Sequence, residues 1–546
     1  MQDAVALHRQ GKLREAEKLY ARVLKAAPEN FDALHLSALC KAQGGQMGEA
    51  FRLISAALKI NAQAPDAWIN FANVLHALKR DDEALAALDK ALALRADCPD
   101  ALTKRGTTLL ALNRTQDALA CFDRVLARNP RHGEALFNRG TARAQLRQAA
   151  DALADFDAVL ALAPSHPGAL YNRGNALADL GRSGEALAAY DAALKLTPNH
   201  VKAWSNRGRA LQALNRQREA VESFDKAIAL QKDYADAHFN AALSLLTLGD
   251  YKRGLAEYEW RWLRSGMSDT RRNYRGTLWR GEFPLAHKTI LLHAEQGLGD
   301  TIQFARYAPL LVRDGANVLM EVQPALKAVF SSLAGIASVH AHGEPLPAYD
   351  AHCPLGSLPL ALKTDSASIP AEIPYLRADE ARIAKWRPQL EPLPGKRVAL
   401  AWAGNPAHVN DRNRSIDVKL LEPLLALAGV SFIGLQRDMR AGDDDFLARH
   451  PQIKNIGGEL ADMADSAAVL SLCDLLIAVD TAVAHLAGAL GRAPWVLLPF
   501  SPDWRWTLQD ERSPWYPQAR LFRQPALGDW ASVIAKVRDA LAQFAA

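Results

Sequence analysis

A repeat with a period of 34 residues runs through the first half of this 546-residue chain. Segments of that length align without a gap when they start at Phe31, Pro65, Pro99, Gly133, Pro167, Val201 and Ala235. A unit this short buries its apolar residues only against its neighbours, so repeats must stack to form a continuous core. The period therefore predicts an array of similar supersecondary units rather than one globular core.

Three places in the repeat carry residues of matched size. The eighth place is small, as Ala38, Ala72, Gly106, Gly140, Gly174, Gly208 and Ala242. The twentieth is alanine, as Ala50, Ala84, Ala118, Ala152, Ala186 and Ala220. The twenty-fourth is large, as Tyr20, Ile54, Leu88, Phe122, Phe156, Tyr190, Phe224 and Tyr258. Small residues let two helices approach closely and large ones fill the remaining space, so we expect a pair of packed helices in each unit.

This pattern closely resembles the tetratricopeptide repeat over residues 1 to about 262, with about seven full units after a partial first one. The resemblance implies a helix-turn-helix superhelix whose groove holds a polypeptide partner. Superhelices of this family can also pair through their convex faces, so a homo-oligomer is a further expectation.

The sixth place of the repeat holds an asparagine ladder, formed by Asn70, Asn138, Asn172, Asn206 and Asn240. Asparagine costs about 0.5–0.7 kcal/mol relative to alanine inside a helix, so its recurrence needs a reason. Its amide can donate to and accept from an extended peptide, and the ladder resembles that of the O-linked N-acetylglucosamine transferases. The alternative is a solvated residue copied by repeat duplication. The same choice applies to the seventh place, where arginines either attract an acidic partner or lie along the helix surface, as Arg105, Arg139, Arg173 and Arg207.

The second half has the pattern of an α/β protein, with short apolar runs between glycine-bearing turns and helical stretches. Predicted strands cover 289–294, 317–322, 397–403, 430–436, 475–479 and 495–499, and predicted helices cover 301–314, 418–428, 464–472 and 482–490. Two Rossmann-like halves are expected to meet near 392–396. Ligands of such sheets bind beyond the carboxyl ends of the strands, where the loops 297–300, 404–415 and 480–485 are predicted to lie.

The segment from Val479 to Leu498 ends one predicted strand, opens a helix and leads into the next strand. It resembles the D-T-G-x-x-H-L-A-x-A-L-G-x-P motif of the ADP-heptose lipopolysaccharide heptosyltransferases, with Ala482 in place of the usual glycine. The resemblance implies a GT-B fold and a donor diphosphate held by Asp480, Thr481 and His485 without a metal. Free amides at the start of the helix favour an anion at this place.

The first loop, from Gly297 to Asp300, resembles the glycine-rich turn of the same family. The resemblance places Gly299 against the donor and makes Asp300 the catalytic base of an inverting transfer. A carboxylate is a weak base, so it would depend on its position beside the acceptor hydroxyl. The alternative is a plain turn in which Asp300 only caps the helix.

Further donor contacts are expected in the second lobe. By resemblance, Arg414 matches a basic residue that contacts the donor phosphates, where a fixed cation neutralises charge on the leaving group. Gln436 ends a predicted strand where the family often places a base- or ribose-contacting residue. The aromatic cluster at 504–506 and 515–517 is either a stacking wall near the donor or part of the core.

Composition and missing motifs exclude other classes. A formal net charge of +5 is too weak to indicate nucleic acid. The chain has no P-loop, no G-x-S-x-G and no H-E-x-x-H motif, and no metal or cofactor is expected. Five scattered cysteines, no signal-peptide pattern and no apolar stretch that could span the membrane predict a cytoplasmic protein.

The sequence thus predicts a superhelix over 1–264, a linker over 265–287, an acceptor-side lobe over 288–394 and a nucleotide-sugar lobe over 395–546. The fold class is an α-helical tetratricopeptide superhelix followed by an α/β GT-B fold with two Rossmann-like lobes. The expected function is transfer of a sugar from a nucleotide-diphosphate donor to a protein or glycan acceptor. The alternative is an inactive repeat scaffold whose second module only binds a nucleotide.

Overall fold

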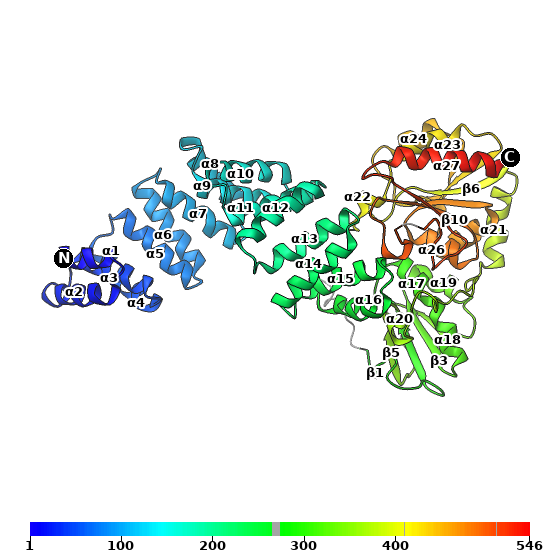
Figure 1. Ribbon diagram of the computed structural model, residues 1–546, viewed down its shortest axis with the longest axis horizontal. Coiled ribbons are helices and arrows are strands. Elements are labelled where there is room, and N and C mark those ends of the chain that lie inside the picture. The colour runs from blue at the N-terminus through cyan, green and yellow to red at the C-terminus, as the bar shows by residue number, and fades with distance from the viewer. Residues whose placement is uncertain (265–273, 409, 509) are drawn as a thin grey trace. The chain divides into compact units, whose positions relative to one another are not determined.

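The computed structural model describes residues 1–264, 274–408, 410–508 and 510–546 (Figure 1). The chain divides into two compact units, Met1–Ala203 and Trp204–Ala546. The second unit therefore contains the last repeats together with the α/β part. None of the helices among these residues is long and apolar enough to cross a membrane.

The repeats are antiparallel helical hairpins, and the described residues contain eight of them, counting the short first pair. Those of the first unit are α1 (Gln2–Arg9) with α2 (Leu13–Ala26), α3 (Phe31–Gln43) with α4 (Met47–Ile60), α5 (Pro65–Ala77) with α6 (Asp81–Leu94), α7 (Pro99–Ala111) with α8 (Thr115–Arg128), α9 (Gly133–Gln145) with α10 (Ala149–Leu162), and α11 (Pro167–Asp179) with α12 (Ser183–Leu196). The next are α13 (Val201–Ala213) with α14 (Gln217–Leu230) and α15 (Ala235–Thr247) with α16 (Tyr251–Tyr258), which continues into the 3₁₀ helix η1 (Glu259–Leu263).

The glycines of the repeat lie against the ring of the same repeat, as their spacing predicts. A Cβ added to Gly106 would lie 2.4 Å from Cε1 of Phe122, and one added to Gly208 would lie 2.5 Å from Cε1 of Phe224. The aromatic ring occupies the volume that any larger side chain would need. Each hairpin thus closes through this contact between its two helices.

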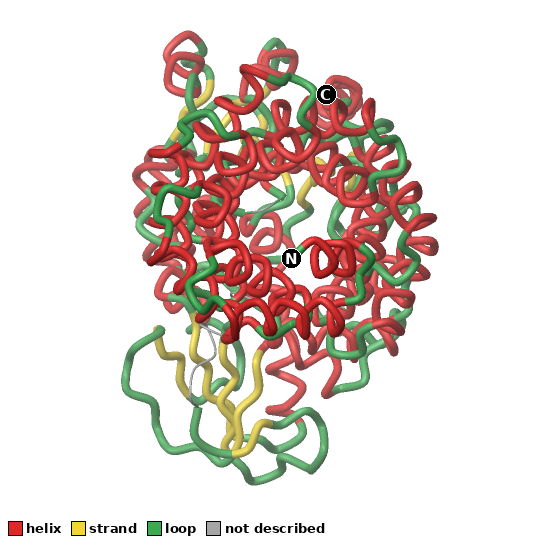
Figure 2. The backbone as a smooth tube through the Cα atoms, turned by 90° about the vertical axis from the view of Figure 1, so that its left-hand side faces the viewer, coloured by secondary structure: helices red, strands yellow, loops and turns green. Residues whose placement is uncertain are grey.

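The α/β part contains two parallel sheets, and the strands lie only in this part of the described chain (Figure 2). The first sheet has the order β1-β5-β2-β3-β4 and the second the order β11-β10-β9-β6-β7-β8. The first comprises β1 (Thr277–Leu278), β2 (Thr289–His293), β3 (Asn317–Val322), β4 (Ser338–Ala341) and β5 (Ala351–Pro354). The second comprises β6 (Lys396–Ala401), β7 (Val430–Gly434), β8 (Ile453–Asn455), β9 (Leu475–Val479), β10 (Pro494–Leu498) and β11 (Arg520–Arg523).

Counted from β2 in the first lobe and from β6 in the second, both orders reverse direction where the first strand meets the fourth, which is the Rossmann arrangement. These reversal points lie between β2 and β5 in the first lobe and between β6 and β9 in the second. The predicted fold class is confirmed, with a helical repeat array followed by two Rossmann-like lobes. The domain boundaries stay a prediction. Residues 265–273 of the predicted linker lie outside the described residues, and its later part contributes β1 to the first sheet.

Helices cover both faces of the second sheet (Figure 1). Val398 and Leu400 of β6 pack in one apolar cluster with residues of α27 (Trp530–Ala545), while Ala399 and Ala401 pack in another with residues of α26 (Ala482–Ala489). This alternation follows from the two-residue period of a strand. It explains why the second lobe reads as nearly continuous apolar runs in the sequence.

Several predicted helices are shorter than expected. The predicted helix 301–314 is divided into α17 (Leu298–Phe304), the 3₁₀ helix η3 (Ala305–Tyr307) and α18 (Ala308–Arg313). The stretch predicted at 418–428 forms the 3₁₀ helix η6 (Val418–Leu421) and the short α23 (Glu422–Leu425). Proline within the first turn marks the start of both α18 and α23, because proline lacks the N–H that an interior position needs.

The remaining helices connect the strands of the two lobes. They are α19 (Lys327–Phe330), α20 (Leu358–Ala361), α21 (Glu380–Leu390), α22 (Asp411–Arg414), α24 (Asp443–Arg449) and α25 (Met463–Leu472). Further 3₁₀ turns are η4 (Pro324–Leu326), η5 (Leu355–Ser357), η7 (Gly457–Glu459) and η8 (Trp504–Trp506). The turns η5 and η8 come soon after the carboxyl ends of β5 and β10, so they border the candidate site.

Candidate functional site

The candidate site lies where the two lobes face each other, at the carboxyl ends of their strands. The helix α17 follows β2 of the first lobe, and α26 follows β9 of the second lobe. These two helices pack together at their first turns. A Cβ added to Gly299 would lie 2.8 Å from Cδ2 of His485 and 3.6 Å from Cα of Ala482. The structure therefore brings the predicted loops 297–300 and 480–485 together in one place.

Asp300 is held by contacts to both lobes. Its Oδ2 accepts a hydrogen bond of 3.0 Å from the Gly297 backbone N–H, which makes Asp300 part of the N-terminal cap of α17. Its Oδ1 forms an ion pair with the guanidinium of Arg505, which belongs to η8 of the second lobe. The carboxylate thus bridges the lobes, and it caps α17 from the third helical position, whereas the N-cap residue itself is Gly297 and not Asp300.

Arg505 is a site residue that the sequence interpretation did not single out. Its guanidinium pairs with Asp300, lies 2.8 Å from Oδ1 of Asp503 and donates from Nε to the side-chain oxygen of Gln303. The side chain is 8% exposed. Burial opposes its charge, but the neighbouring carboxylates prevail and raise the pKa of Arg505. The sequence signal that could have indicated Arg505 is the Trp-Arg-Trp segment at 504–506, which follows a predicted strand.

Arg414 is a cation with few partners. It ends α22, and its Nε lies 3.9 Å from Oδ1 of Asp411, too far for a hydrogen bond. Among the described residues this buried Nε has no hydrogen-bond acceptor. The guanidinium packs on Gly404, where an added Cβ would lie 2.7 Å from Nη2. A largely buried cation without a full set of partners is suited to an anionic ligand.

Burial shifts the pKa values of Asp480 and His485 in opposite directions. Burial raises the pKa of Asp480 to about 6, Asp503 adds to the effect, and Arg414 is among the groups that oppose it. Burial lowers the pKa of His485 well below its usual value, and the nearby arginines add to the effect. His485 Nδ1 lies 3.2 Å from the hydroxyl of Tyr516, and Nε2 lies 3.8 Å from Oδ1 of Asp480. A neutral histidine here can donate one hydrogen bond without adding charge.

Thr481 is the N-cap residue of α26, and its side chain makes no capping hydrogen bond. The first amides of this eight-residue helix are therefore not satisfied by the Thr481 hydroxyl. Gly299 of the α17 turn contacts the first turn of α26, so this helix start and the α17 turn border the same region. The helix dipole and these N–H groups favour an anion at this end.

Gln436 has a different environment from the one predicted for a donor contact. Its side chain is buried, with Oε1 accepting from the Ala403 N–H at 3.0 Å and Nε2 donating to the Asp438 carbonyl at 3.1 Å. Both halves of the amide are used inside the protein. Gln436 thus fixes the loop that follows β6 and leads toward Arg414.

The aromatic cluster of the second lobe is core. Trp504, Trp506, Trp515 and Tyr516 are buried in the larger apolar cluster of the α/β part. Arg306 of the first lobe reaches this cluster, donating to the Trp515 carbonyl at 2.6 Å. These residues therefore hold the two lobes together. Of the two roles considered from the sequence, a stacking wall near the donor or a part of the core, they have the core role.

The asparagine ladder lies on the first helices of the repeats. Asn70 contacts His35, with 3.0 Å between Nδ2 and Nε2. Asn138 in α9 and Asn172 in α11 are partly exposed. Their amides are thus accessible for contact with an extended chain.

Three of the four arginines at the seventh place, Arg105, Arg139 and Arg173, pair with aspartates of the preceding repeat, and Arg207 donates to the Ser223 hydroxyl. Three such ion pairs are Arg105–Asp89 at 2.7 Å, Arg139–Asp123 at 2.8 Å and Arg173–Asp157 at 2.6 Å. Arg139 also pairs with buried Asp155 at 2.6 Å. These three ion pairs favour the alternative in which the arginines lie along the helix surface, and attraction of an acidic partner stays a prediction.

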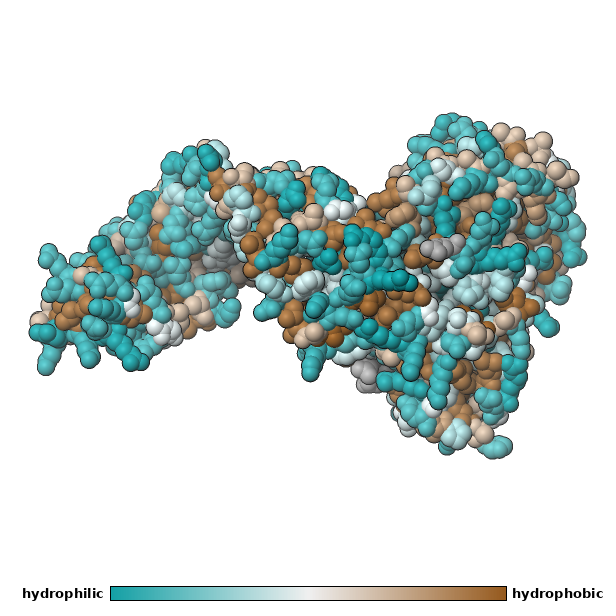
Figure 3. Space-filling model, in the orientation of Figure 1, coloured by the Kyte–Doolittle hydropathy of each residue, from teal (hydrophilic) through white to brown (hydrophobic). Residues whose placement is uncertain are grey.

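Apolar side chains remain exposed among the polar ones on the surface of the repeats (Figure 3). At the ends of the second helices they recur at the thirtieth place, as Ile60, Leu94, Leu196 and Leu230. Singly exposed leucines are common on protein surfaces and need no functional explanation.

Comparison with known proteins identifies the repeats. Tetratricopeptide repeat models match residues 103–167, 140–201 and 201–234, and a model of anaphase-promoting complex, cyclosome, subunit 3 matches residues 9–91. The Protein FlbA of Caulobacter vibrioides is 29% identical over 330 residues, which is 56% of this chain and 54% of that protein. The chain thus spans about half the length of this curated relative.

Solved structures similar to this chain include other repeat proteins. YrrB, described as a tetratricopeptide repeat protein with an unusual peptide-binding site, is 28% identical and covers 34% of this chain and 95% of its own, with a TM-score of 0.30. The type IV pilus biogenesis factor PilW is 23% identical and covers 38% of this chain and 96% of its own, with a TM-score of 0.36. From the family models and the 34-residue hairpins together, the repeats of this chain are tetratricopeptide repeats.

Proposed function

We propose that this protein is a metal-independent glycosyltransferase that moves a sugar from a nucleotide-diphosphate donor to a polypeptide or glycan acceptor. The observation that carries the proposal is the close approach of α17 and α26, which brings Asp300 and the start of α26 together between the lobes, with Arg414 near enough to lower the pKa of Asp480 and of His485. This is the region where open parallel sheets bind their ligands.

The donor diphosphate binds at the first amides of α26 and beside Arg414. The helix N-terminus supplies aligned N–H donors, and the guanidinium supplies a charge that is not fully compensated by Asp411. His485, kept neutral by its buried surroundings, adds a hydrogen-bond donor without repelling Arg414. Such fixed donors stabilise charge that develops on the departing nucleoside diphosphate.

Asp300 takes the proton from the acceptor hydroxyl. The acceptor oxygen forms a bond to the anomeric carbon, the bond from that carbon to the donor phosphate oxygen breaks, and the nucleoside diphosphate leaves with both electrons. Attack from the side opposite the leaving group inverts the anomeric configuration. Tetratricopeptide repeats suggest a polypeptide partner, so the superhelix recruits the acceptor or a protein that carries it.

One observation favours a second candidate function, an inactive nucleotide-binding scaffold. Both oxygens of Asp300 are engaged, one by the Gly297 N–H and the other by Arg505. A base so occupied must release Arg505 before it can take a proton. If Arg505 never releases it, the module binds a nucleotide and the repeats alone carry the function.

The test is transfer from ADP-, UDP-, GDP- and dTDP-sugars to protein and glycan acceptors by the full chain, compared with Asp300→Asn. We expect one donor class to turn over and the variant to lose about 10²–10⁴-fold in rate, the range of general-base catalysis. Donor binding measured by calorimetry should persist in Asp300→Asn. Binding without turnover in the unmodified protein supports the inactive scaffold. If none of the four donors binds, both candidate functions are contradicted.

A further inference from the structure

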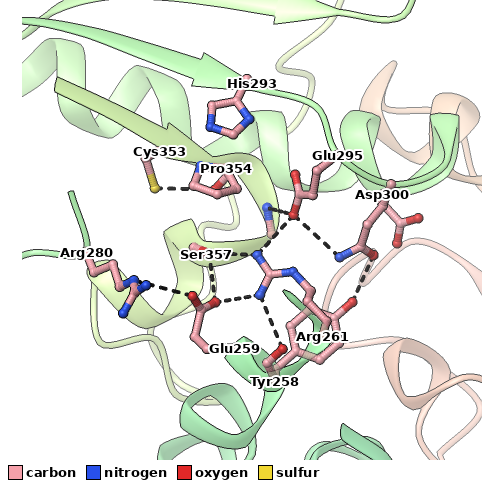
Figure 4. Close-up of polar contacts among 12 residues, drawn as sticks. Tyr258, Glu259, Arg261, Arg280, His293, Glu295, Asp300, Cys353, Pro354 and Ser357 are labelled. Carbon is pink, nitrogen blue, oxygen red and sulfur yellow. Dashed lines mark hydrogen bonds and ion pairs between the residues drawn. The ribbon is translucent and has the colours of Figure 1, made fainter. Parts of the chain in front are cut away.

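A buried polar cluster joins the last repeat to the first lobe (Figure 4). Its centre is Arg261 in η1, whose side chain is 2% exposed. The guanidinium lies 2.5 Å from Glu259 Oε1, 3.1 Å from Glu295 Oε1 and 2.7 Å from the Ser357 hydroxyl. Ser357 in turn donates to Glu259 Oε1 at 2.7 Å.

The cluster lies at the reversal point of the first sheet. Glu295 follows β2 by two residues, and Gly356 and Ser357 follow β5. The Gly356 N–H donates to Glu295 Oε1 at 3.1 Å, so Arg261 and Glu295 connect the loops after both strands. In parallel sheets this is the usual position of a ligand. Here a side chain from the repeats occupies it.

The contacts continue from the cluster to Asp300. Tyr258 of α16 donates its hydroxyl proton to Oε1 of Gln296 at 2.9 Å, and the Gln296 carbonyl accepts from Nε2 of Gln323 at 2.7 Å. The next residue, Gly297, donates its N–H to Asp300 Oδ2. The orientation of the Asp300 carboxylate therefore depends on a peptide whose neighbour is fixed by the last repeat.

The chemistry of the cluster is typical of positioning rather than of stability alone. Burying charged groups costs free energy that their mutual attraction only partly offsets, and apolar residues of similar volume often stabilise equally well. The cluster balances Arg261 and Arg280 against Glu259 and Glu295, with Arg280 Nε 3.5 Å from Glu259 Oε2. Directed hydrogen bonds fix the angle of a loop, which an apolar contact does less well.

We propose that Tyr258 and Arg261 of the last repeat are positioning residues that set the geometry of the loop 295–297 and, through it, of Asp300. This inference rests on the proposed transferase function for its kinetic part. It assigns the last repeat to the loop after β2, whereas the preceding repeat contacts the loop after β10, where Ser501 donates to the Gln212 carbonyl at 2.9 Å and Asn215 donates to the Phe500 carbonyl. A carboxylate displaced by about 1 Å would lose about 10²-fold in rate.

The experiment compares Arg261→Lys and Tyr258→Phe with Arg264→Lys in the full chain. Arg264 is the matched control, because it pairs with Asp236 at 2.8 Å and contacts neither the loop nor the strand ends. The first readout is amide hydrogen exchange of the peptides that cover 295–304 and 355–357. We expect at least a fivefold faster exchange there for Arg261→Lys and a smaller increase for Tyr258→Phe, with the control unchanged.

The second readout is kinetic, with the donor that the unmodified protein uses. We expect kcat to fall about 10- to 100-fold in Arg261→Lys with the donor KM unchanged. In an Asp300→Asn background the same substitution should cost less than twofold, because a positioning residue acts only through the group it positions. A full additional loss in that background would overturn the inference.

Exchange measurements separate this inference from the proposed function, since they need no turnover. If the protein transfers no sugar, faster exchange confined to the two loops still supports positioning by the last repeat. Unchanged exchange of 295–304 in both variants overturns it, whether or not the enzyme is active. If Arg261→Lys does not fold, Tyr258→Phe, which removes one hydroxyl, decides the outcome.

Discussion

The carboxylate of Asp300 in the first lobe is ion-paired with the guanidinium of Arg505 in the second lobe. Arg505 also binds Asp503 and Gln303, so one side chain links the loop after β10 to the helix after β2. This pairing adds to the other contacts between the lobes and limits how accessible Asp300 is as a base.

Replacing Arg505 by methionine should lower the free energy of unfolding by about 2–4 kcal/mol, because the carboxylates of Asp300 and Asp503 lose their cation. Both carboxylates are partly exposed, so water keeps the loss below that of a fully buried ion pair. Chemical denaturation measures the change. Arg538→Met is the control, since its pair with Asp539 is exposed, and it should alter stability by less than about 0.5 kcal/mol. Equal stability of the two variants would contradict a stabilising role for the ion pairs of Arg505.

The buried position of Asp480 predicts a pH-dependent stability. Its pKa of about 6 lies above the usual value near 4, so the folded protein takes up a proton between those pH values. The cost of the buried carboxylate is absent below about pH 4 and complete above about pH 6, where it amounts to about 1–3 kcal/mol. Asp480→Asn should therefore raise stability at pH 8 and raise it much less at pH 4.5, where Asp480 of the folded protein is mostly protonated.

Thermal unfolding of both proteins at the two pH values checks this prediction. Asp444→Asn, at an exposed position of α24, serves as the control and should show no such difference. A gain of equal size at pH 4.5 and pH 8 would mean that the carboxylate charge is not the cause.

The surroundings of two glycines predict opposite effects of their substitution by alanine. Gly106→Ala should destabilise by about 1–3 kcal/mol, because its Cβ would lie 2.4 Å from the Phe122 ring. Gly184→Ala should stabilise by about 0.5–1 kcal/mol, because nothing lies within 4 Å of its Cβ and alanine favours the helix. Urea denaturation of the unmodified protein and of the two variants measures their stabilities. Adding Phe122→Leu to Gly106→Ala should restore part of the lost stability.

Truncation should show that the last repeats belong to the α/β unit. The larger apolar cluster includes Ala242, Leu246, Tyr251, Leu255 and Tyr258 from these repeats. A chain that starts at Trp204 should therefore unfold cooperatively, whereas one that starts at Lys288 exposes this surface and should aggregate. Light scattering and calorimetry distinguish the two, and a stable monomer from Lys288 would contradict the prediction.

The asparagine ladder can be tested without disturbing the candidate site. Asn138→Ala combined with Asn172→Ala should stabilise the helices slightly, by about 0.5 kcal/mol each, because alanine has the higher helix propensity. If the ladder binds an extended chain, the KM for a polypeptide acceptor should rise about tenfold while donor hydrolysis stays constant. An unchanged acceptor KM would favour the alternative of copied, solvated residues.

Much of the fold could be predicted from the sequence because its signals are local or periodic. The 34-residue period located each helical hairpin, and the match of Gly106 with Phe122 followed from their spacing. Strands β1, β4, β5, β8 and β11 were not predicted, since each has only two to four residues and too little alternation to stand out. The division of the chain near residue 204 also has no local signal, because the last repeats look like the others.

The candidate site shows the same limit. Asp300, Asp480, Thr481 and His485 lie in recognisable motifs at the ends of predicted strands, so the sequence by itself determined which loops to compare. Only the tertiary structure decided that Arg505 pairs with Asp300 and that Arg261 reaches the loop after β2. Those partners are separated from their contacts by 205 and 34 residues, and ion pairs between distant segments depend on how the lobes and the last repeat pack. Local patterns specify elements, whereas the charges that meet in a buried site are set by packing.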